Sequence, residues 1–284
     1  MKVLLTGATG FVGNAITQAL VSRDVSIRAI VRGMRTHPPG ITEHVHTDDM
    51  FEEDAAFYSR ALDGVDAVIH AAWFVEHGAY VTSSKNLSAL AGTLRFGQAA
   101  IEAGVKRFVG LGTCFEYDLT APMPLTSAST LAPNTPYGAA KAAAYMALSR
   151  AFAHAELSFA WARLFYLHGE GEDPRRFVAS IKAQLSVGGP AKMSSGRQVR
   201  DYLHVADAGR LIAALCFDHT EGAVNICSGQ PQSLAELALS IAAPLGQEHL
   251  LAIGALPDRP GDPAVITGTP YVPLEETTND ANHA

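Results

Sequence analysis

Two side chains four residues apart offer the clearest chemistry in this sequence. Tyr137 and Lys141 lie at positions i and i+4 of the segment NTPYGAAKAAAY, so they share one face of a helix that begins after Pro136. A phenol has a pKa of about 10 in water, and a lysine ammonium one turn away lowers it. Such a pair can protonate a carbonyl oxygen, or deprotonate an alcohol, while a hydride moves. The spacing alone is common in helices, so its meaning depends on the motifs around it.

Residues 112–118, GTCFEYD, hold a second group of reactive side chains. They follow the apolar run RFVGLG and so leave the C-terminal end of a buried strand, the edge at which open α/β sheets bind ligands. The candidates are the hydroxyl of Thr113, the thiol of Cys114, the carboxylates of Glu116 and Asp118, and the phenol of Tyr117. The stretch by itself does not decide between them.

The segment TGATGFVG places three glycines between the first predicted strand and the first predicted helix. Glycines there allow a tight turn and a close approach of the backbone to a pyrophosphate, whose charge the helix N-terminus favours. This position favours a dinucleotide site; a turn kept only for strand–helix packing is the alternative. The predicted cofactor contacts are Gly7, Thr9, Gly10, Phe11, Val12 and Gly13.

The end of the second predicted strand bears on the choice between NAD and NADP. VSIRAIVRGMR ends in Arg32, followed by Arg35, and no carboxylate occurs before Glu43. Two guanidinium groups suit a 2′-phosphate, so NADP(H) is the preferred cofactor and NAD(H) remains possible. A pair of solvated surface arginines is the alternative. Asp48 or Asp49, after the next short strand, is expected near the adenine edge, with a plain loop acid as the other interpretation.

These motifs need a parallel sheet to bring them together, and the first half of the chain predicts one. Short apolar runs (KVLLT, VSIRAIV, DAVIHAA, RFVGLG and LSFAWARLF) alternate with longer helical patterns. Such alternation gives an α/β fold with a doubly wound parallel sheet. We expect a dinucleotide-binding domain over residues 1–169, a small substrate lobe over 170–263, and a C-terminal tail over 264–284 that frays at its end.

The composition excludes several classes of protein. The chain has 284 residues, 48% of them hydrophobic, and a formal net charge of -7, which argues against a nucleic-acid-binding surface. Its three cysteines have neither a disulfide pattern nor zinc-site spacing, so we expect no metal. No apolar run is long enough to cross a bilayer, and the start of the chain runs straight into a strand without a signal peptide. We therefore expect a cytoplasmic protein without a membrane partner.

Taken together, the motifs resemble those of the extended short-chain dehydrogenases/reductases, in particular the sugar-nucleotide epimerases, dehydratases and reductases. The resemblance rests on TGATGFVG, DAVIHAA, the stretch around Thr113, YGAAK, RLFYLHG, RQVRDYLHVAD, NICSG and RPGD, which follow one another from the start of the chain to about Asp262. It implies a Rossmann domain with a small C-terminal sugar-nucleotide lobe. It also implies a catalytic set of Tyr137, Lys141 and Thr113.

The same resemblance assigns further contacts. His70, Ala71 and Ala72 would line the cofactor trough, and residues 163–166 would line the nicotinamide side, with Phe165 at the cofactor and Tyr166 at the substrate. Arg200 and Arg259 would bind the diphosphate of a nucleotide-sugar substrate, as guanidinium forks do; an ion pair of Arg200 with Asp201 is the alternative. Helices 83–103 and 137–154 would form a homodimer interface. Ala89 replaces an asparagine that the family often has, so a polar contact is either missing or supplied by Asn86.

The resemblance also narrows the choice of reaction. Dehydratases of this family carry Asp and Glu directly after the active-site threonine, where this chain has Cys114 and Phe115. Phenylalanine cannot move a proton, so dehydration is disfavoured. Cys114 stands one residue before the catalytic cysteine of fucose-synthase-like enzymes, and we interpret it as a buried thiol, with a functional role as the alternative. Glu116, Tyr117 and Asp118 are expected to be structural or solvated.

The resulting prediction is an NADPH-dependent reductase of a nucleotide-linked 4-keto-6-deoxysugar. An NAD-dependent nucleotide-sugar 4-epimerase is the alternative within the family. A non-catalytic regulator that senses the cofactor is the alternative from another class, disfavoured because Tyr137, Lys141 and Thr113 are all present. The sequence leaves open which nucleotide and which sugar are bound.

Overall fold

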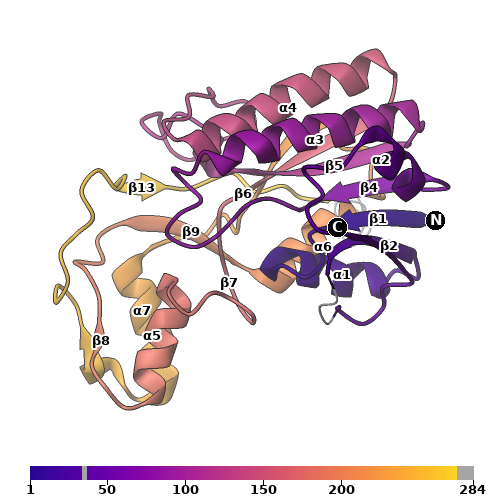
Figure 1. Cartoon of the computed structure of the whole chain (residues 1–284). Coiled ribbons are helices and arrows are strands. Elements are labelled where there is room, and N and C mark those ends of the chain that lie inside the picture. The colour runs from indigo at the N-terminus through magenta and orange to yellow at the C-terminus, as the bar shows by residue number, and fades with distance from the viewer. Residues whose placement is uncertain (34–36, 274–284) are drawn as a thin grey trace, which may run out of the picture.

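The computed structural model describes residues 1–33 and 37–273, and its centre is a seven-stranded sheet (Figure 1). The strands are all parallel and follow the order β10-β6-β5-β4-β1-β2-β3. This is the predicted doubly wound fold, including the short strand expected before Asp48. The bounds are β1 (Lys2–Thr6), β2 (Ser26–Arg32), β3 (Glu43–Thr47), β4 (Ala67–His70), β5 (Arg107–Thr113), β6 (Ser158–Leu164) and β10 (Gly222–Ile226).

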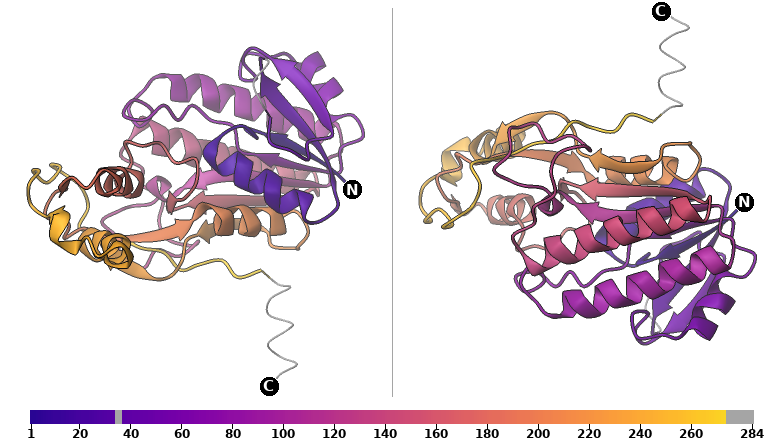
Figure 2. Two further views of the ribbon diagram at one scale, coloured as in Figure 1. Left: turned by 90° about the horizontal axis from the view of Figure 1, so that it is seen from below. Right: turned by 90° about the horizontal axis from the view of Figure 1, so that it is seen from above.

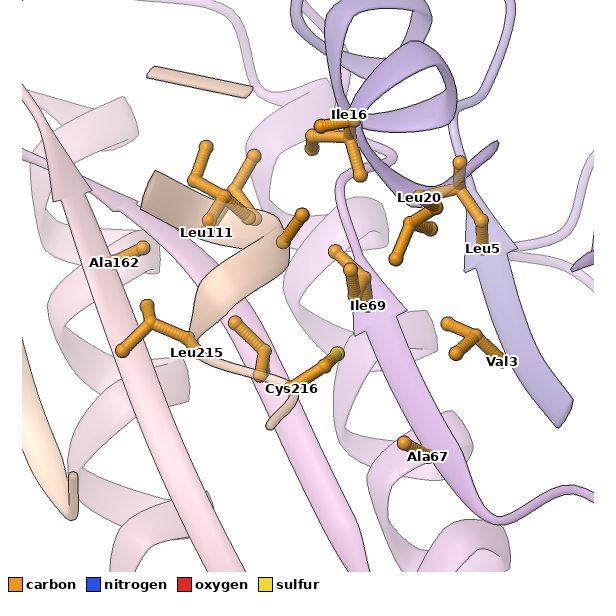
Figure 3. Packing of buried hydrophobic residues seen from close by; sticks show 14 of the residues in the cluster. Val3, Leu5, Ile16, Leu20, Ala67, Ile69, Leu111, Ala162, Leu215 and Cys216 are labelled. Atoms are coloured by element: carbon orange, nitrogen blue, oxygen red, sulfur yellow. The ribbon is translucent and has the colours of Figure 1, made fainter. Parts of the chain in front are cut away.

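Helices cover both faces of the sheet, because its central strands are apolar on both sides. Val3 and Leu5 of β1 point into the cluster under one helical layer, whereas Leu4 points into the cluster under the other. Figure 3 shows the first cluster, in which Ile16 and Leu20 pack toward the strands. The first layer is α1 (Phe11–Val21) and α6 (Val205–Ala214); the second is α2 (Ala55–Leu62), α3 (Lys85–Glu102) and α4 (Pro136–His154).

A smaller lobe lies beyond the C-terminal edge of the sheet (Figures 1 and 2). Its helices share a separate apolar cluster that includes Ile181, Leu185 and Ala238. A second, small sheet connects this lobe to the first domain, with β7 pairing with β9 in parallel. The elements are β7 (Tyr166–His168), α5 (Phe177–Ser186), β8 (Ala191–Lys192), β9 (Val199–His204), β11 (Pro231–Ser233), α7 (Leu234–Ala242), β12 (Leu251–Ala252) and β13 (Val265–Ile266).

The lobe is not one continuous stretch, which differs from the expected division at residues 170–263. Helix α6 packs against α1, and β10 pairs with β6 at the edge of the main sheet, so both belong to the first domain. The chain thus crosses between the two parts more than once. Residues 264–273 are not a loose tail either, because β13 pairs with β9 and Tyr271 N donates to Asn225 O. Residues 274–284, expected to fray, lie outside the described residues.

Candidate active site

Three loops with predicted roles meet at the C-terminal edge of the sheet. In the strand register Thr6 lies beside His70, and His70 lies beside Gly110 of β5. The glycine turn after β1, the segment after β4 and the stretch that begins at Thr113 therefore leave the sheet side by side. This edge is where a doubly wound sheet binds its ligands.

Helix α4 brings Tyr137 and Lys141 to this edge. The helix begins with Thr135, whose side chain accepts from Gly138 N, and with proline at its first position. A Cβ on Gly138 would lie 2.3 Å from Phe115 O, so only glycine lets the first turn pack onto the GTCFEYD stretch. Tyr137 and Lys141 are both buried, with 9% and 3% of their surface exposed.

Thr113 ends β5 and caps a short 3-10 turn, η1 (Cys114–Glu116). Its hydroxyl oxygen accepts from Phe115 N, and its own N–H donates to Glu116 Oε1 at 2.8 Å. Burial, and next the neighbouring Tyr80 phenol, raise the pKa of Tyr137, while a hydrogen bond with Thr113 acts in the opposite direction. The structure thus brings together all three predicted catalytic residues, with the threonine hydroxyl against the tyrosine phenol.

The Lys141 side chain contacts a backbone carbonyl and an aromatic ring. Lys141 Nζ donates to Leu111 O at 2.6 Å and lies 3.8 Å from the centre of the Trp73 ring. Burial lowers the pKa of Lys141 to about 7, and the Glu116 carboxylate partly offsets this. Burial keeps the pKa of Tyr137 above its ordinary value, so the lowering expected from Lys141 together with an oxidised nicotinamide stays a prediction.

A buried ion pair supports the turn that carries Thr113. Arg163 Nε donates to Glu116 Oε2 at 2.7 Å, and the two side chains are 1% and 0% exposed. The Trp161 indole N–H donates to the same carboxylate. A Cβ on Gly112 would lie 2.2 Å from that indole nitrogen, so a side chain there would displace the network. Arg163 therefore lies beneath the site and does not line the nicotinamide side.

The other candidates in GTCFEYD are buried or hydrogen-bonded within the protein. Burial raises the pKa of the Cys114 thiol to about 12, so this cysteine is a buried neutral thiol. Tyr117 donates its hydroxyl proton to Asn225 Oδ1 at 2.6 Å. Asp118 accepts from the backbone and hydroxyl of Thr120, which lowers the pKa of its carboxyl group.

The glycine turn has the geometry that a dinucleotide needs. Gly7 has φ +74°, and a Cβ there would lie 2.8 Å from Ala72 N; a Cβ on Gly13 would lie 2.0 Å from Gly7 O. Helix α1 begins at Gly10 without a side-chain cap, which leaves the N–H groups of its first turn free to bind an anion. The residues present fit a bound nicotinamide dinucleotide. Thr9 is exposed on this turn, while Phe11 and Val12 are half-buried in the first turn of α1 and Ala71 and Ala72 are half-buried after β4.

The side chains of His70 and Phe165 are buried within the protein. His70 is buried, with Nδ1 2.9 Å from Thr6 Oγ1 and Nε2 2.9 Å from Thr93 Oγ1, and burial lowers its pKa to about 3. Its ring ties the strand ends to α3, so no ring nitrogen is left for a cofactor. The Phe165 side chain packs among buried residues such as Cys114 and Leu125, which leaves only its backbone to face a ligand.

At the adenosine end, Arg32 is exposed where β2 ends and forms no ion pair with the described residues. Arg35 lies outside the described residues. Asp48 is exposed directly after β3. Three histidines that were not predicted lie next to this end: the ring centres of His37 and His44 are 4.5 Å apart, and His46 Nδ1 lies 3.3 Å from Gly33 O.

In the lobe, the Arg200 guanidinium forms an ion pair within the protein. Its guanidinium donates to Asp262 Oδ1 at 2.7 Å and lies 5.4 Å from the centre of the Tyr166 ring. The alternative pairing with Asp201 is wrong, because Asp201 accepts instead from Ser228 and Gly229. Tyr166 faces Tyr202 across β7 and β9, with ring centres 5.4 Å apart. Arg259 is exposed and, within residues 1–33 and 37–273, forms no ion pair.

Three residues near the catalytic pair were not predicted. Trp73 and Tyr80 come from the segment between β4 and α3, and their ring centres lie 6.4 and 4.9 Å from that of Tyr137. Asn86, in the first turn of α3, holds both of them through hydrogen bonds. The only signal in the sequence was the position of Trp73, directly after the DAVIHAA motif.

Within the described part of the chain, no cluster of histidine, cysteine or carboxylate side chains is arranged to hold a metal ion. Among those same residues, the helices are too short or too polar to traverse a bilayer.

The buried lysine should make stability depend on pH. Below pH 7 Lys141 is charged in the folded and unfolded chain, so the cost of burying the charge is fully present. As the pH rises, the folded protein loses this proton at about 7 and the unfolded chain only near 10.5, so the wild type gains free energy of unfolding in between. The stabilising effect of Lys141→Met should therefore be about 3 kcal/mol larger at pH 6.5 than at pH 9.5.

Urea unfolding of both proteins at the two pH values measures this difference. Lys106→Met, at a side chain that is 82% exposed, is the matched control and should show almost no pH dependence. An equal effect of Lys141→Met at both pH values would show that the lysine keeps an ordinary pKa.

Comparison with known proteins agrees with this geometry. The dTDP-6-deoxy-L-talose 4-dehydrogenase (NAD(+)) of Aggregatibacter actinomycetemcomitans is 24% identical over 237 residues, 82% of this chain and 87% of that protein. The UDP-glucose 4-epimerase of Streptomyces lividans is 26% identical, over 94% of this chain and 88% of that protein. The structure of MoeE5 in complex with UDP-glucose and NAD superimposes with a TM-score of 0.80 at 26% identity, over 97% of this chain and 91% of that chain. Because the model of the NAD dependent epimerase/dehydratase family matches residues 3–227, the chain belongs to this family of extended short-chain dehydrogenases/reductases.

Proposed function

We propose that this enzyme reduces a nucleotide-linked 4-keto-6-deoxysugar with NADPH, and that Tyr137 supplies the proton. The observation that carries the proposal is the buried contact between Tyr137 and Thr113, beside Lys141 and the glycine turn. A bound nicotinamide supplies the hydride to the keto carbon. The carbonyl oxygen then takes the phenol proton of Tyr137, while the Thr113 hydroxyl orients that oxygen.

The Tyr137 phenol is in the protonated form that reduction needs. Burial raises its pKa, so it keeps its proton at neutral pH. An ammonium has three N–H donors, of which Lys141 uses one on Leu111 O, so the others are available to ribose hydroxyls. After the transfer, the ammonium also stabilises the phenolate that remains.

Dehydration lacks its proton carriers. Cys114 is a buried thiol with a raised pKa, and Phe115 has no proton to exchange. Glu116 is the only nearby carboxylate in the turn, and the Arg163 guanidinium and Trp161 indole occupy it. These three positions support hydride transfer without loss of water.

The 4-epimerase is the second candidate, supported by the relatives that act on UDP-glucose. Such a reaction oxidises and re-reduces one carbon, and it uses the same tyrosine as base and then as acid. Incubating the protein with UDP-glucose and NAD, with proton NMR of the products, distinguishes the two. Formation of the C4 epimer without net NAD reduction would favour the epimerase.

Replacing Tyr137 by Phe should lower kcat about 10²- to 10⁴-fold, because the proton donor is lost. The assay is loss of reduced-nicotinamide absorbance with 4-keto-6-deoxysugars linked to UDP, dTDP, GDP and CDP. Cofactor affinity should stay unchanged, and Tyr145→Phe on the same helix serves as the control. If the wild type oxidises no NADPH with any of these substrates, the reductase proposal is wrong; full biological effect of the Phe variant would favour a regulator.

Replacing Arg32 by Ser should raise the KM for NADPH about ten- to a hundredfold and leave that for NADH unchanged. The exposed guanidinium would otherwise bind the 2′-phosphate through a charged hydrogen bond. Steady-state kinetics with both cofactors measures the change, with the exposed Arg60→Ser of α2 as control. A wild type that prefers NADH would contradict the NADP assignment.

We further propose that α3 and α4 form the interface of a homodimer. Leu87 and Met146 are 67% and 60% exposed on these neighbouring helices (Figures 1 and 2). Between the helices lies a cavity of about 330 Å³, lined by Leu94, Gln98, Ile101, Glu102, Ala147, Leu148 and Ala151. Apolar side chains on adjacent helix faces are covered by a partner in many oligomers.

Met146→Glu should shift the protein to monomers, because a charge would be buried between subunits. Light scattering after size-exclusion chromatography gives the mass. Val187→Glu, at a position that is 81% exposed on the smaller lobe, should leave the dimer intact. A monomeric wild type would contradict the proposed interface.

A further inference from the structure

The Lys141 ammonium is enclosed by aromatic rings. Its Nζ lies 3.8 Å from the centre of the Trp73 ring and 5.8 Å from that of Trp161, and the Leu111 carbonyl accepts one of its protons. An ammonium over an indole face is attracted by the ring quadrupole, most strongly when water is excluded. Trp161 belongs to the core of the sheet, whereas Trp73 comes from the segment after β4 and is only half-buried.

Trp73 is held in place by a hydrogen bond to Asn86. Its indole N–H donates to Asn86 Oδ1 at 2.9 Å, and Asn86 is fully buried. The amide of Asn86 donates in turn to Tyr80 O at 2.6 Å and to Ser83 O at 2.9 Å. All the polar atoms of this amide are thus used to fix the segment from 73 to 83. The Trp73 and Phe51 rings also meet in an edge-to-face arrangement, with centres 6.3 Å apart.

We propose that Trp73, fixed by Asn86, is a positioning residue that holds the Lys141 ammonium for the reaction at Tyr137. This deepens the proposed hydride-transfer function and rests on it. The ring offers a face for the charged amine where solvent is excluded, so it favours the charged form and holds the amine beside Leu111 O. Asn86 thereby acts on the site through Trp73. It lies one turn before Ala89, the position at which the family often has an asparagine.

Other charged and titratable groups also act on Lys141. The Glu116 carboxylate, itself paired with Arg163, favours the charged amine. His70 is neutral, because both burial and Lys141 lower its pKa. Tyr137 lies one turn before the lysine on α4. Tyr137 is also near Trp73, with ring centres 6.4 Å apart, so a shift in the titration of Lys141 is compared with that in Trp73→Phe, which keeps an aromatic ring at this position.

The experiment compares Trp73→Leu with Trp73→Phe. Leucine keeps the site apolar but removes the aromatic face, so the charged form of Lys141 loses a partner and its pKa should fall by about half a unit or more. Phenylalanine keeps an aromatic face and should leave the pKa closer to that of the wild type. The pKa is followed by the 13Cε and 15Nζ chemical shifts of Lys141 in protein with labelled lysine, assigned with Lys141→Arg.

Phe74→Leu is the matched control, because the Phe74 ring faces Lys85 Nζ at 4.8 Å and not Lys141. It should leave the titration of Lys141 unchanged. If Trp73→Leu does not fold, Trp73→Met gives the same comparison with another apolar side chain. An unchanged or higher pKa of Lys141 in the Leu or Met variant would overturn the proposal.

Activity separates a positioning role from a structural one. The fall of kcat at high pH should move to lower pH in Trp73→Leu and return toward the wild-type position in Trp73→Phe. A uniform loss of kcat without a shift of this limb would mean that Trp73 only supports the fold. The NMR titration needs neither substrate nor cofactor, so it remains decisive for Trp73 even if no tested sugar nucleotide is reduced.

Discussion

The buried ion pair of Glu116 and Arg163 is the interaction on which the site depends. Both charges lie in the core, where an unpaired charge would cost several kcal/mol. The carboxylate also accepts from the Trp161 indole and from Thr113 N, so it joins β6, the end of β5 and the turn that follows. This network holds Thr113 at the end of β5, next to α4. Because the Glu116 carboxylate is bonded to Arg163 and Trp161, it is not available as a general acid or base.

The same carboxylate also acts on the catalytic pair, on which burial has the largest effect. Its charge raises the pKa of Lys141 against the effect of burial, and it adds to the raised pKa of Tyr137. An acid–base pair in water would have a lysine that is charged and a tyrosine that is neutral up to about pH 10. Here the lysine is close to losing its proton at neutral pH while the tyrosine keeps its own more firmly. Ligand contacts and the Trp73 ring therefore matter for the charge on Lys141.

Much of the first domain could be predicted from the sequence because its signals are local. Strand periodicity, the glycine turn and the Tyr137–Lys141 spacing each lie within about a dozen residues, and each is found where expected. The division at residue 170 failed because β10 pairs with β6 across a long stretch of chain, which no local pattern reveals. The burial of the His70 and Phe165 side chains could not be predicted, because it depends on residues far away in sequence. The same holds for the contact of Trp73 with Asn86, and for Asp262 as the partner of Arg200.

The pairing of Arg200 with Asp262 changes how a diphosphate would be bound in the lobe. An anion that approaches Arg200 meets a guanidinium whose charge is partly neutralised, and its oxygens must compete with a carboxylate at 2.7 Å. Arg259 lies three residues before that carboxylate and has an exposed, unpaired side chain within the described residues. An exposed guanidinium such as that of Arg259 can attract an anion over a distance, whereas the Arg200 guanidinium contacts Asp262 and the Tyr166 ring. The two arginines that the resemblance treats alike therefore have different surroundings in this chain.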